Sequence, residues 1–249
     1  MATVRAAGGL VLRGPREILL PVAAIHIPLS VILASITLLA SFTILRGEPL
    51  DPLAEDATRT LFLFLSTVGA WILFSQVARA AAVRAVAGVW REEDLSLPET
   101  LDPAFTRMGG LIALALLLFA VAAIAVIPFA GWILAPYLTL RMSLAFDALI
   151  LEDVPPFQAV RRSWELTRGR LLRLLGVLGL GSLSLLLPLA VLSLLGLAVT
   201  GSRTQQILAG AGYSITQGIL TIPVVAFITA CGTTFYLQAI GTLDVRSDV

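Results

Sequence analysis

The run from Met108 to Leu140 contains no charged residue, and it constrains the fold more than any other part of the chain. A helix needs about 20 mostly apolar residues to cross the hydrocarbon core of a bilayer. The run is too long for one such helix, and Pro128, Gly131 and Pro136 interrupt it. The sequence therefore predicts two transmembrane helices joined by a tight turn near Pro128–Gly131.

Composition places the whole chain in the same class. Of its 249 residues, 58% are hydrophobic and 13% are charged, whereas about a quarter of residues are charged in a soluble domain. We expect an all-α fold, a six-span transmembrane helix bundle that forms a single integral membrane domain. The spans are expected at about residues 18–45, 60–78, 109–127, 132–151, 174–200 and 215–240.

The distribution of arginine favours six spans over five. A five-span alternative merges the spans at 109–127 and 132–151 and leaves Arg141–Arg173, the most basic stretch, outside. Basic residues accumulate in the short loops on the cytoplasmic side of a membrane. With six spans, the basic segments lie inside and the acidic loop 46–59 lies outside. Both termini are therefore predicted to be cytoplasmic.

Short amphipathic helices are expected on the cytoplasmic surface at about 95–108 and 155–170. In the second helix Pro155 and Pro156 suit the first turn, where a missing N–H costs nothing. Asp153 is expected to cap that helix, and Trp164 is expected to anchor it at the lipid headgroups. Gly169 is expected to act as a hinge into the next span.

The helix of the second span is expected to continue past the membrane. Its continuation through Arg79 and Arg84 to Trp90 is predicted to be an arginine-lined stalk. A pattern of charged short helix, span, turn and span begins near Val4, Leu95 and Asp153. This pattern is compatible with three repeated helical hairpins.

One region also resembles a known family. Arg141 lies inside a span that ends in "LILED", and "AVRRSWELTRGR" then leads into a span rich in Leu and Gly. The stretch Arg141–Gly176 resembles the bacterial membrane-domain family found ahead of glycerophosphodiester phosphodiesterases and also as stand-alone integral membrane proteins. The resemblance implies a six-span module of the bacterial cytoplasmic (inner) membrane. It does not imply phosphodiesterase activity, because the hydrolase of that family is a separate barrel domain for which this chain has no room.

Ionisable groups at membrane depth are costly and therefore mark candidate functional sites. Arg141 is expected near mid-membrane and Asp147 nearer the cytoplasmic end of the same span. The two point to different faces of the helix, so Arg79 is the candidate partner of Asp147. One hypothesis is an anion or lipid-headgroup site, because the forked donors of guanidinium match phosphate oxygens. Its candidate contacts are Arg79, Arg141, Arg161, Arg162 and Arg168.

The competing interpretation of these arginines is a set of internal salt bridges, with side chains that extend to the interface. His26 also has two interpretations, a proton-relay group or a hydrogen-bonded packing residue, and its span contains no acidic partner. The chain has one His and one Cys, and it lacks a phosphate-binding glycine loop with lysine. A catalytic zinc, hydrolase or ATPase site is therefore not expected. We expect no enzyme activity, no cofactor and no nucleic-acid partner.

Three functions from different classes remain. The first is a non-catalytic inner-membrane protein that binds or senses an anionic lipid or amphiphile at its cytoplasmic side. The second is a structural or assembly partner of another membrane protein, which the small residues Gly176, Gly179 and Gly181 of the fifth span would serve. The third is a small secondary transporter, for which Arg141, Asp147 and His26 are the available ionisable groups.

Overall fold

The computed structural model describes residues 2–45, 55–125, 127–183 and 203–247. In these ranges the regular structure is helical, which confirms the all-α prediction. A further helix covers Leu171–Leu183. The other helices are α1 (Ala2–Arg13), α2 (Pro15–Leu45), α3 (Glu55–Arg91), α4 (Leu97–Thr106), α5 (Met108–Ile124), α6 (Ala130–Met142), α7 (Ala145–Leu151), α8 (Pro156–Thr167) and α10 (Arg203–Ser247).

Three stretches of helix among the described residues are long and apolar enough to cross a membrane: Pro15–Ser35, Ala130–Leu151 and Ile215–Gly241. A fourth is present if α4 and α5, which meet at a bend of 63°, form one span. The chain is therefore a helical membrane protein. Much of the predicted span at 174–200 lies outside the described residues, so the count of six and the threefold repeat stay predictions.

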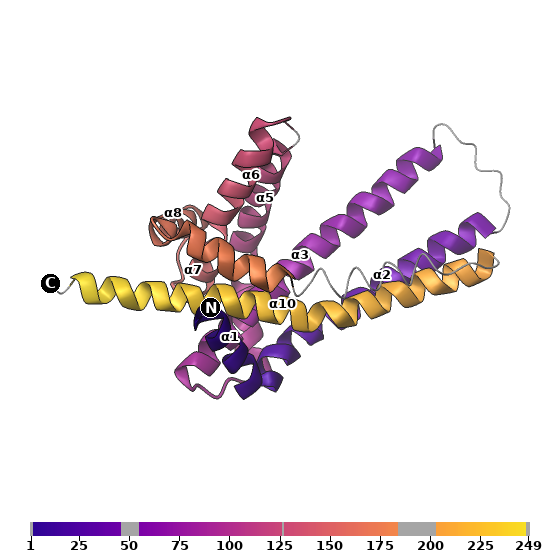
Figure 1. The fold of residues 1–249 in the computed structure, drawn as a ribbon. Coiled ribbons are helices and arrows are strands. Elements are labelled where there is room, and N and C mark those ends of the chain that lie inside the picture. Colours follow the sequence, from indigo (N-terminus) through magenta and orange to yellow (C-terminus); the bar gives the residue numbers. More distant parts are fainter. Residues whose placement is uncertain (1, 46–54, 126, 184–202, 248–249) are drawn as a thin grey trace.

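The helices diverge from a common core (Figure 1). The α5–α6 hairpin projects in one direction, whereas α2, α3 and α10 extend in another. α10 has 45 residues, which corresponds to about 68 Å of helix, and this is more than twice the roughly 30 Å of a bilayer core. The predicted span at 215–240 is therefore only the middle of a longer helix.

The C-terminal half of α3 lies in the core rather than in solvent. Residues 77–78, 80–83 and 85–88 are all buried, and most of them are alanine. The helix ends at Arg91, one residue beyond the predicted Trp90, but this segment is packed into the core and does not form the predicted arginine-lined stalk. Small side chains allow α1, α7 and α10 to approach α3 closely. The segment is therefore packed against other helices although it contains Arg79 and Arg84.

The α5–α6 hairpin confirms the turn predicted near Pro128. α5 ends at Ile124 and α6 begins at Ala130, and the N–H of Gly131 donates to the carbonyl of Ile127 at 3.0 Å. A Cβ on Gly131 would overlap the carbonyl of Ile124, so this position requires glycine. At the tip Phe129 and Trp132 are 80% and 67% exposed, which suits a hairpin that is surrounded by lipid.

The predicted interfacial helices at 95–108 and 155–170 correspond to α4 and α8. The expected role of Asp153 is wrong, because Pro155 is the N-cap of α8 and no side chain caps the helix. Asp153 has a φ of 57° and forms an ion pair with Arg107 instead. The predicted hinge at Gly169 is present as a break between α8, which ends at Thr167, and the helix that begins at Leu171. Gly169 has a φ of 72°, a backbone conformation that favours glycine.

α3 ends in a left-handed turn that is built without glycine. The N–H of Glu93 donates to the carbonyl of Gly88 at 3.0 Å, and the N–H of Glu92 donates to that of Val89 at 3.4 Å. These two bonds are the pattern of a Schellman motif, in which the residue after the helix normally is glycine. Here that residue is Glu92, with a φ of 60° and an exposed side chain.

We expect Glu92→Gly to stabilise the protein by about 1 kcal/mol, because glycine adopts the left-handed conformation without the penalty that a Cβ brings. The midpoint of heat unfolding in detergent micelles, followed by circular dichroism, measures the change. Asp94→Gly is the matched control, since Asp94 is also exposed but lacks a positive φ. An equal or smaller gain for Glu92→Gly than for Asp94→Gly would contradict the prediction.

Candidate functional site

Asp147 lies at the centre of the core and is only 2% exposed. The hydroxyl of Thr233 on α10 donates to its Oδ1 at 2.7 Å. The charge of Arg79 on α3 favours the ionised carboxylate, but no ion pair within 4.0 Å joins the two groups among the described residues, so their direct pairing stays a prediction. Arg79 also donates to the carbonyl of Ser143 at 2.8 Å, and its guanidinium carbon lies 4.4 Å from the ring centroid of Phe146. Arg79 is therefore enclosed by protein on several sides.

Glu152, just after α7, joins three elements. Its Oε1 accepts a hydrogen bond of 2.5 Å from the hydroxyl of Tyr236 and one of 3.1 Å from Nε of Arg162. Burial opposes the charge of Arg162, but the hydrogen bond and the charge of Glu152 outweigh burial and raise the pKa of the guanidinium. On α10, Thr233 binds Asp147 and Tyr236, almost one turn further along, binds Glu152. These two bonds attach α7 to α10, and the bond from Arg162 to Glu152 attaches α8 to the same group.

Arg141 lies at the end of α6, against α8. Its guanidinium donates to the hydroxyl of Tyr137 at 3.1 Å, the carbonyl of Trp164 at 3.3 Å and the hydroxyl of Thr167 at 3.3 Å. Its guanidinium carbon lies 5.4 Å from the ring centroid of Tyr137 and 5.3 Å from that of Trp164. The hydroxyl of Ser163 donates to the backbone carbonyl of Arg141 at 2.6 Å, which holds α8 against α6. We call this arrangement the Arg141 site.

The five predicted contact arginines do not have equivalent surroundings. Arg161 and Arg162 form ion pairs with Glu165 and Glu152, at 3.2 and 3.1 Å. Arg79 interacts with the charge of Asp147, whereas Arg141 and the exposed Arg168 have no ion pair with a carboxylate among the described residues. Internal salt bridges therefore account for part of the predicted set, and they leave Arg141 and Arg168 unneutralised.

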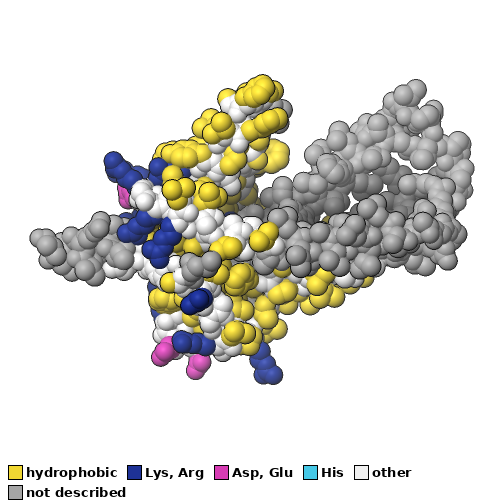
Figure 2. All heavy atoms as spheres, in the orientation of Figure 1, with side chains coloured by type: hydrophobic (Ala, Val, Ile, Leu, Met, Phe, Trp, Pro, Cys, Tyr) yellow, Lys and Arg dark blue, Asp and Glu magenta, His cyan; other side chains and the backbone are white. Residues whose placement is uncertain are grey.

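The charged groups are segregated from the apolar helices. Figure 2 shows basic side chains at the left and the bottom of the described part of the molecule, while hydrophobic side chains cover the α5–α6 hairpin at the top. His26 is buried on α2, and its Nε2 has no hydrogen-bond partner among the described residues, so this nitrogen decides between neither of the two interpretations of His26. Within the described ranges no group of three His, Cys, Asp or Glu residues is placed to hold a metal ion.

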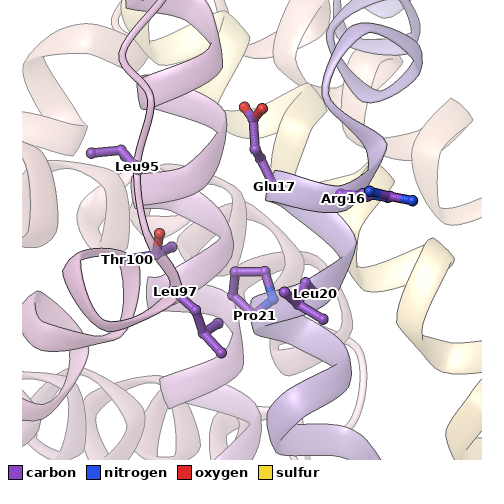
Figure 3. Close-up of a pocket in the computed structure, with 7 residues that line it drawn as sticks. All are labelled: Arg16, Glu17, Leu20, Pro21, Leu95, Leu97 and Thr100. Atoms are coloured by element: carbon purple, nitrogen blue, oxygen red, sulfur yellow. The ribbon is translucent and has the colours of Figure 1, made fainter.

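A small cavity of about 110 Å³ lies between the start of α2 and the segment that leads into α4 (Figure 3). Leu20, Pro21, Leu95 and Leu97 form most of its wall. Its charged groups are the neighbours Arg16 and Glu17, and the Arg16 side chain points away in Figure 3. The opposite charges and the apolar wall make this cavity a poor site for an anion.

A larger cavity of about 390 Å³ was missed at the level of sequence. Arg170 and Arg173 line it, together with residues of α10 and Ala2. Both arginines come directly after the hinge at Gly169, and their position there was the available signal. The pairing with α10 could not be read from the sequence, because the two segments are separated by more than sixty residues.

Comparison with family models, with curated proteins and with solved structures gives no match to this chain. The arrangement of its own side chains is therefore the basis for any functional assignment.

Proposed function

We propose that the chain is a non-catalytic, multi-pass protein of the bacterial inner membrane that binds the headgroup of an anionic lipid or amphiphile. In this proposal both termini, the Arg141 site and the arginines of α8 lie on the cytoplasmic side, as the positive-inside bias requires. The resemblance of Arg141–Gly176 to the membrane domain found with glycerophosphodiester phosphodiesterases agrees with a non-catalytic role.

The environment of Arg141 carries the proposal. Its hydrogen-bond partners are two hydroxyls and one backbone carbonyl, and none of them neutralises the positive charge. The rings of Tyr137 and Trp164 flank the guanidinium, and both residues are about 40% exposed. Tyr and Trp occupy the headgroup level of membranes, so in this proposal Arg141 lies at that level and not near mid-membrane as the sequence predicted. A lipid phosphate is the anion that this arrangement would meet. Phe157, 83% exposed on α8, supports contact of this helix with lipid.

We expect Arg141→Ala to reduce retention of the bound anionic lipid about tenfold, since loss of a charge-assisted hydrogen bond costs about 1.5 kcal/mol. Native mass spectrometry of protein released from native membrane discs measures the retained lipids. Arg91→Ala is the matched control, because Arg91 is half-exposed and pairs with Glu93. If the lipids of the wild type and of Arg141→Ala both match the bulk membrane, the proposal is wrong.

A second candidate function, assembly with another membrane protein, is favoured by the helix Leu171–Leu183. Gly181 packs against Ile228 and Cys231 of α10, whereas Gly176 and Gly179 are exposed with open space before them. Exposed glycines let another helix approach closely. Cross-linking should then capture one stoichiometric partner, and Gly176→Leu should abolish this capture. A monomer in both samples would exclude this function.

The transporter hypothesis has less support, because neither cavity described above is lined by Arg141, Asp147 or His26.

A further inference from the structure

We propose that the α5–α6 hairpin is a re-entrant membrane anchor, which enters the bilayer from the side of α8 and turns back near the midplane. Its partner is the acyl-chain region of a single leaflet, which the proposed orientation makes the cytoplasmic one. The sequence predicts two complete spans in this region, at 109–127 and 132–151. A hairpin of either kind returns the chain to the side from which it came, so the predicted location of both termini is the same.

Each helix of the hairpin buries only a narrow stripe of side chains. The buried residues are Leu111, Leu114 and Val121 of α5 and Gly131, Ala135 and Met142 of α6. Every other described residue from Gly109 to Thr139 is at least partly exposed, and none of them is charged. Lipid surrounds a helix that is hydrophobic on all sides, whereas a protein partner would cover one side. The acyl chains of the bilayer therefore fit this surface.

α8 marks the level of the membrane surface on the hairpin. This helix carries Arg161 and Glu165, whose side chains are 84% and 51% exposed, so it cannot lie in hydrocarbon. A Cβ on Gly110 of α5 would lie 3.6 Å from Pro156 at the start of α8, and Arg141 of α6 donates to a backbone carbonyl near the end of α8 at 3.3 Å. The hairpin therefore leaves the surface at Gly110 and returns to it at Arg141.

Beyond that level the hairpin is too short to cross the bilayer, although Figure 1 shows it projecting past α8. α5 extends about 21 Å from Gly110 to its end at Ile124, and α6 extends about 17 Å from Ala130 to Arg141. The hydrocarbon core is about 30 Å thick. The tip therefore lies near the middle of the bilayer, and any tilt of the hairpin would reduce its depth further.

The side chains at the tip are those of a turn in hydrocarbon. Residues 127–133 are Ile, Pro, Phe, Ala, Gly, Trp and Ile, whereas the predicted outer loop at 46–59 contains four acidic residues. The rings of Phe129 and Trp132 lie 6.0 Å apart. Turns in water commonly contain Asn, Asp and Ser, and this one contains none of them. An apolar tip of this kind favours the bilayer interior over the water on the far side.

The backbone of the turn also suits a place without water. A polar backbone group in hydrocarbon needs a partner within the chain. The N–H of Ile127 donates to the carbonyl of Ile124 at 3.0 Å, and the N–H of Ala130 donates to the carbonyl of Pro128 at 2.7 Å. Pro128 itself has no N–H. The turn therefore satisfies several of its own donors where a turn in water would not need to.

Depth-dependent fluorescence quenching tests the inference on the full chain in discs of phosphatidylcholine and phosphatidylglycerol. Phe129→Cys carries a bimane label at the tip. Phe129 is 80% exposed, so its replacement should not disturb packing, and the native Cys231 is buried. Lipids with a nitroxide at the headgroup, at the start of the acyl chain or at its terminal methyl group provide the depth scale.

We expect the label within about 5 Å of the bilayer midplane, with the strongest quenching by the nitroxide at the terminal methyl group. Gln158→Cys, at an exposed position of α8, is the matched control and should be quenched most strongly by the headgroup nitroxide. A tip label about 15 Å from the midplane would show a complete crossing and overturn the inference. A tip label that no lipid quenches would show that a second copy or another protein covers the hairpin, and this would also overturn it.

The depth of the tip and the retention of lipid by Arg141 are separate observations. A label at the midplane, together with unchanged lipids in Arg141→Ala, would uphold the inference and refute the proposed function. A label at the far headgroups, together with loss of lipid from that variant, would refute the inference while the proposed function stands.

A second measurement needs no label within the bilayer. In sealed vesicles a membrane-impermeant maleimide should not react with Phe129→Cys from either side, and it should react after detergent is added. Gln158→Cys should react from the side of α8 alone. Reaction of Phe129→Cys from the opposite side would overturn the inference.

Discussion

Replacing Asp147 with alanine should lower the free energy of unfolding by about 3 kcal/mol, because it leaves the charge of Arg79 in the core without its compensating carboxylate. Asp147 is 2% exposed, so solvent cannot replace the lost interactions. The free energy can be measured by unfolding in mixed micelles with an increasing fraction of sodium dodecyl sulfate. Asp147→Asn, which keeps an oxygen for the Thr233 hydroxyl, separates the charge from the hydrogen bond.

A double-mutant cycle tests the same interaction. When Arg79→Met is combined with Asp147→Ala, the total loss should be smaller than the sum of the two single losses, because neither charge is then left alone. A loss below about 1 kcal/mol for Asp147→Ala, the value of a single neutral hydrogen bond, would show that the charges do not stabilise the core.

Gly218→Ala should destabilise the contact between α2 and α10 by about 1–3 kcal/mol, the usual cost of overpacking. A Cβ at Gly218 would overlap both the Oγ and the Cβ of Ser30. Ser30 cannot turn away without loss, since it is buried and its hydroxyl donates to the carbonyl of His26 at 2.6 Å. Unfolding in the same mixed micelles measures the effect.

Gly212→Ala is the matched control, because Gly212 also lies in α10 and a Cβ there would meet no atom within 4 Å. That substitution should stabilise α10 by up to about 1 kcal/mol through helix propensity alone. Ser30→Gly should recover much of the stability of the Gly218→Ala variant. If the two alanine variants have the same stability, the close approach of α2 and α10 at Gly218 is not a constraint on the fold.

Hydrophobic periodicity and turn residues predicted much of the fold. The uncharged run beyond Met108 was correctly divided at Pro128, and short helices are present at both positions where interfacial helices were predicted. These features are local, since each depends on residues within one helix or one turn. The C-terminal half of α3 was misinterpreted because alanine is only weakly hydrophobic, and Arg79 and Arg84 made the segment resemble a solvated one. Its burial depends on the helices packed around it.

The candidate sites show the same distinction. The pairing of Arg162 with Glu152 joins residues ten positions apart, and the charge pattern of that stretch marked it as important. The bonds from α10 to Asp147 and Glu152 join residues more than eighty positions apart. No local pattern reports such a contact, so neither Thr233 nor Tyr236 was predicted. The arginine cavity was missed for the same reason.

The alanine-rich segment of α3 also determines which changes the protein can tolerate during evolution. In a core built from leucine and phenylalanine, many substitutions remove volume, and neighbouring side chains can shift to compensate. At Ala80–Ala82 nearly every substitution adds volume instead, and the surrounding helix backbones have little room to move. Glycine and serine should therefore be almost the only replacements accepted there. Ala80–Ala82 should diverge slowly even though they contribute no side chain to the Arg141 site.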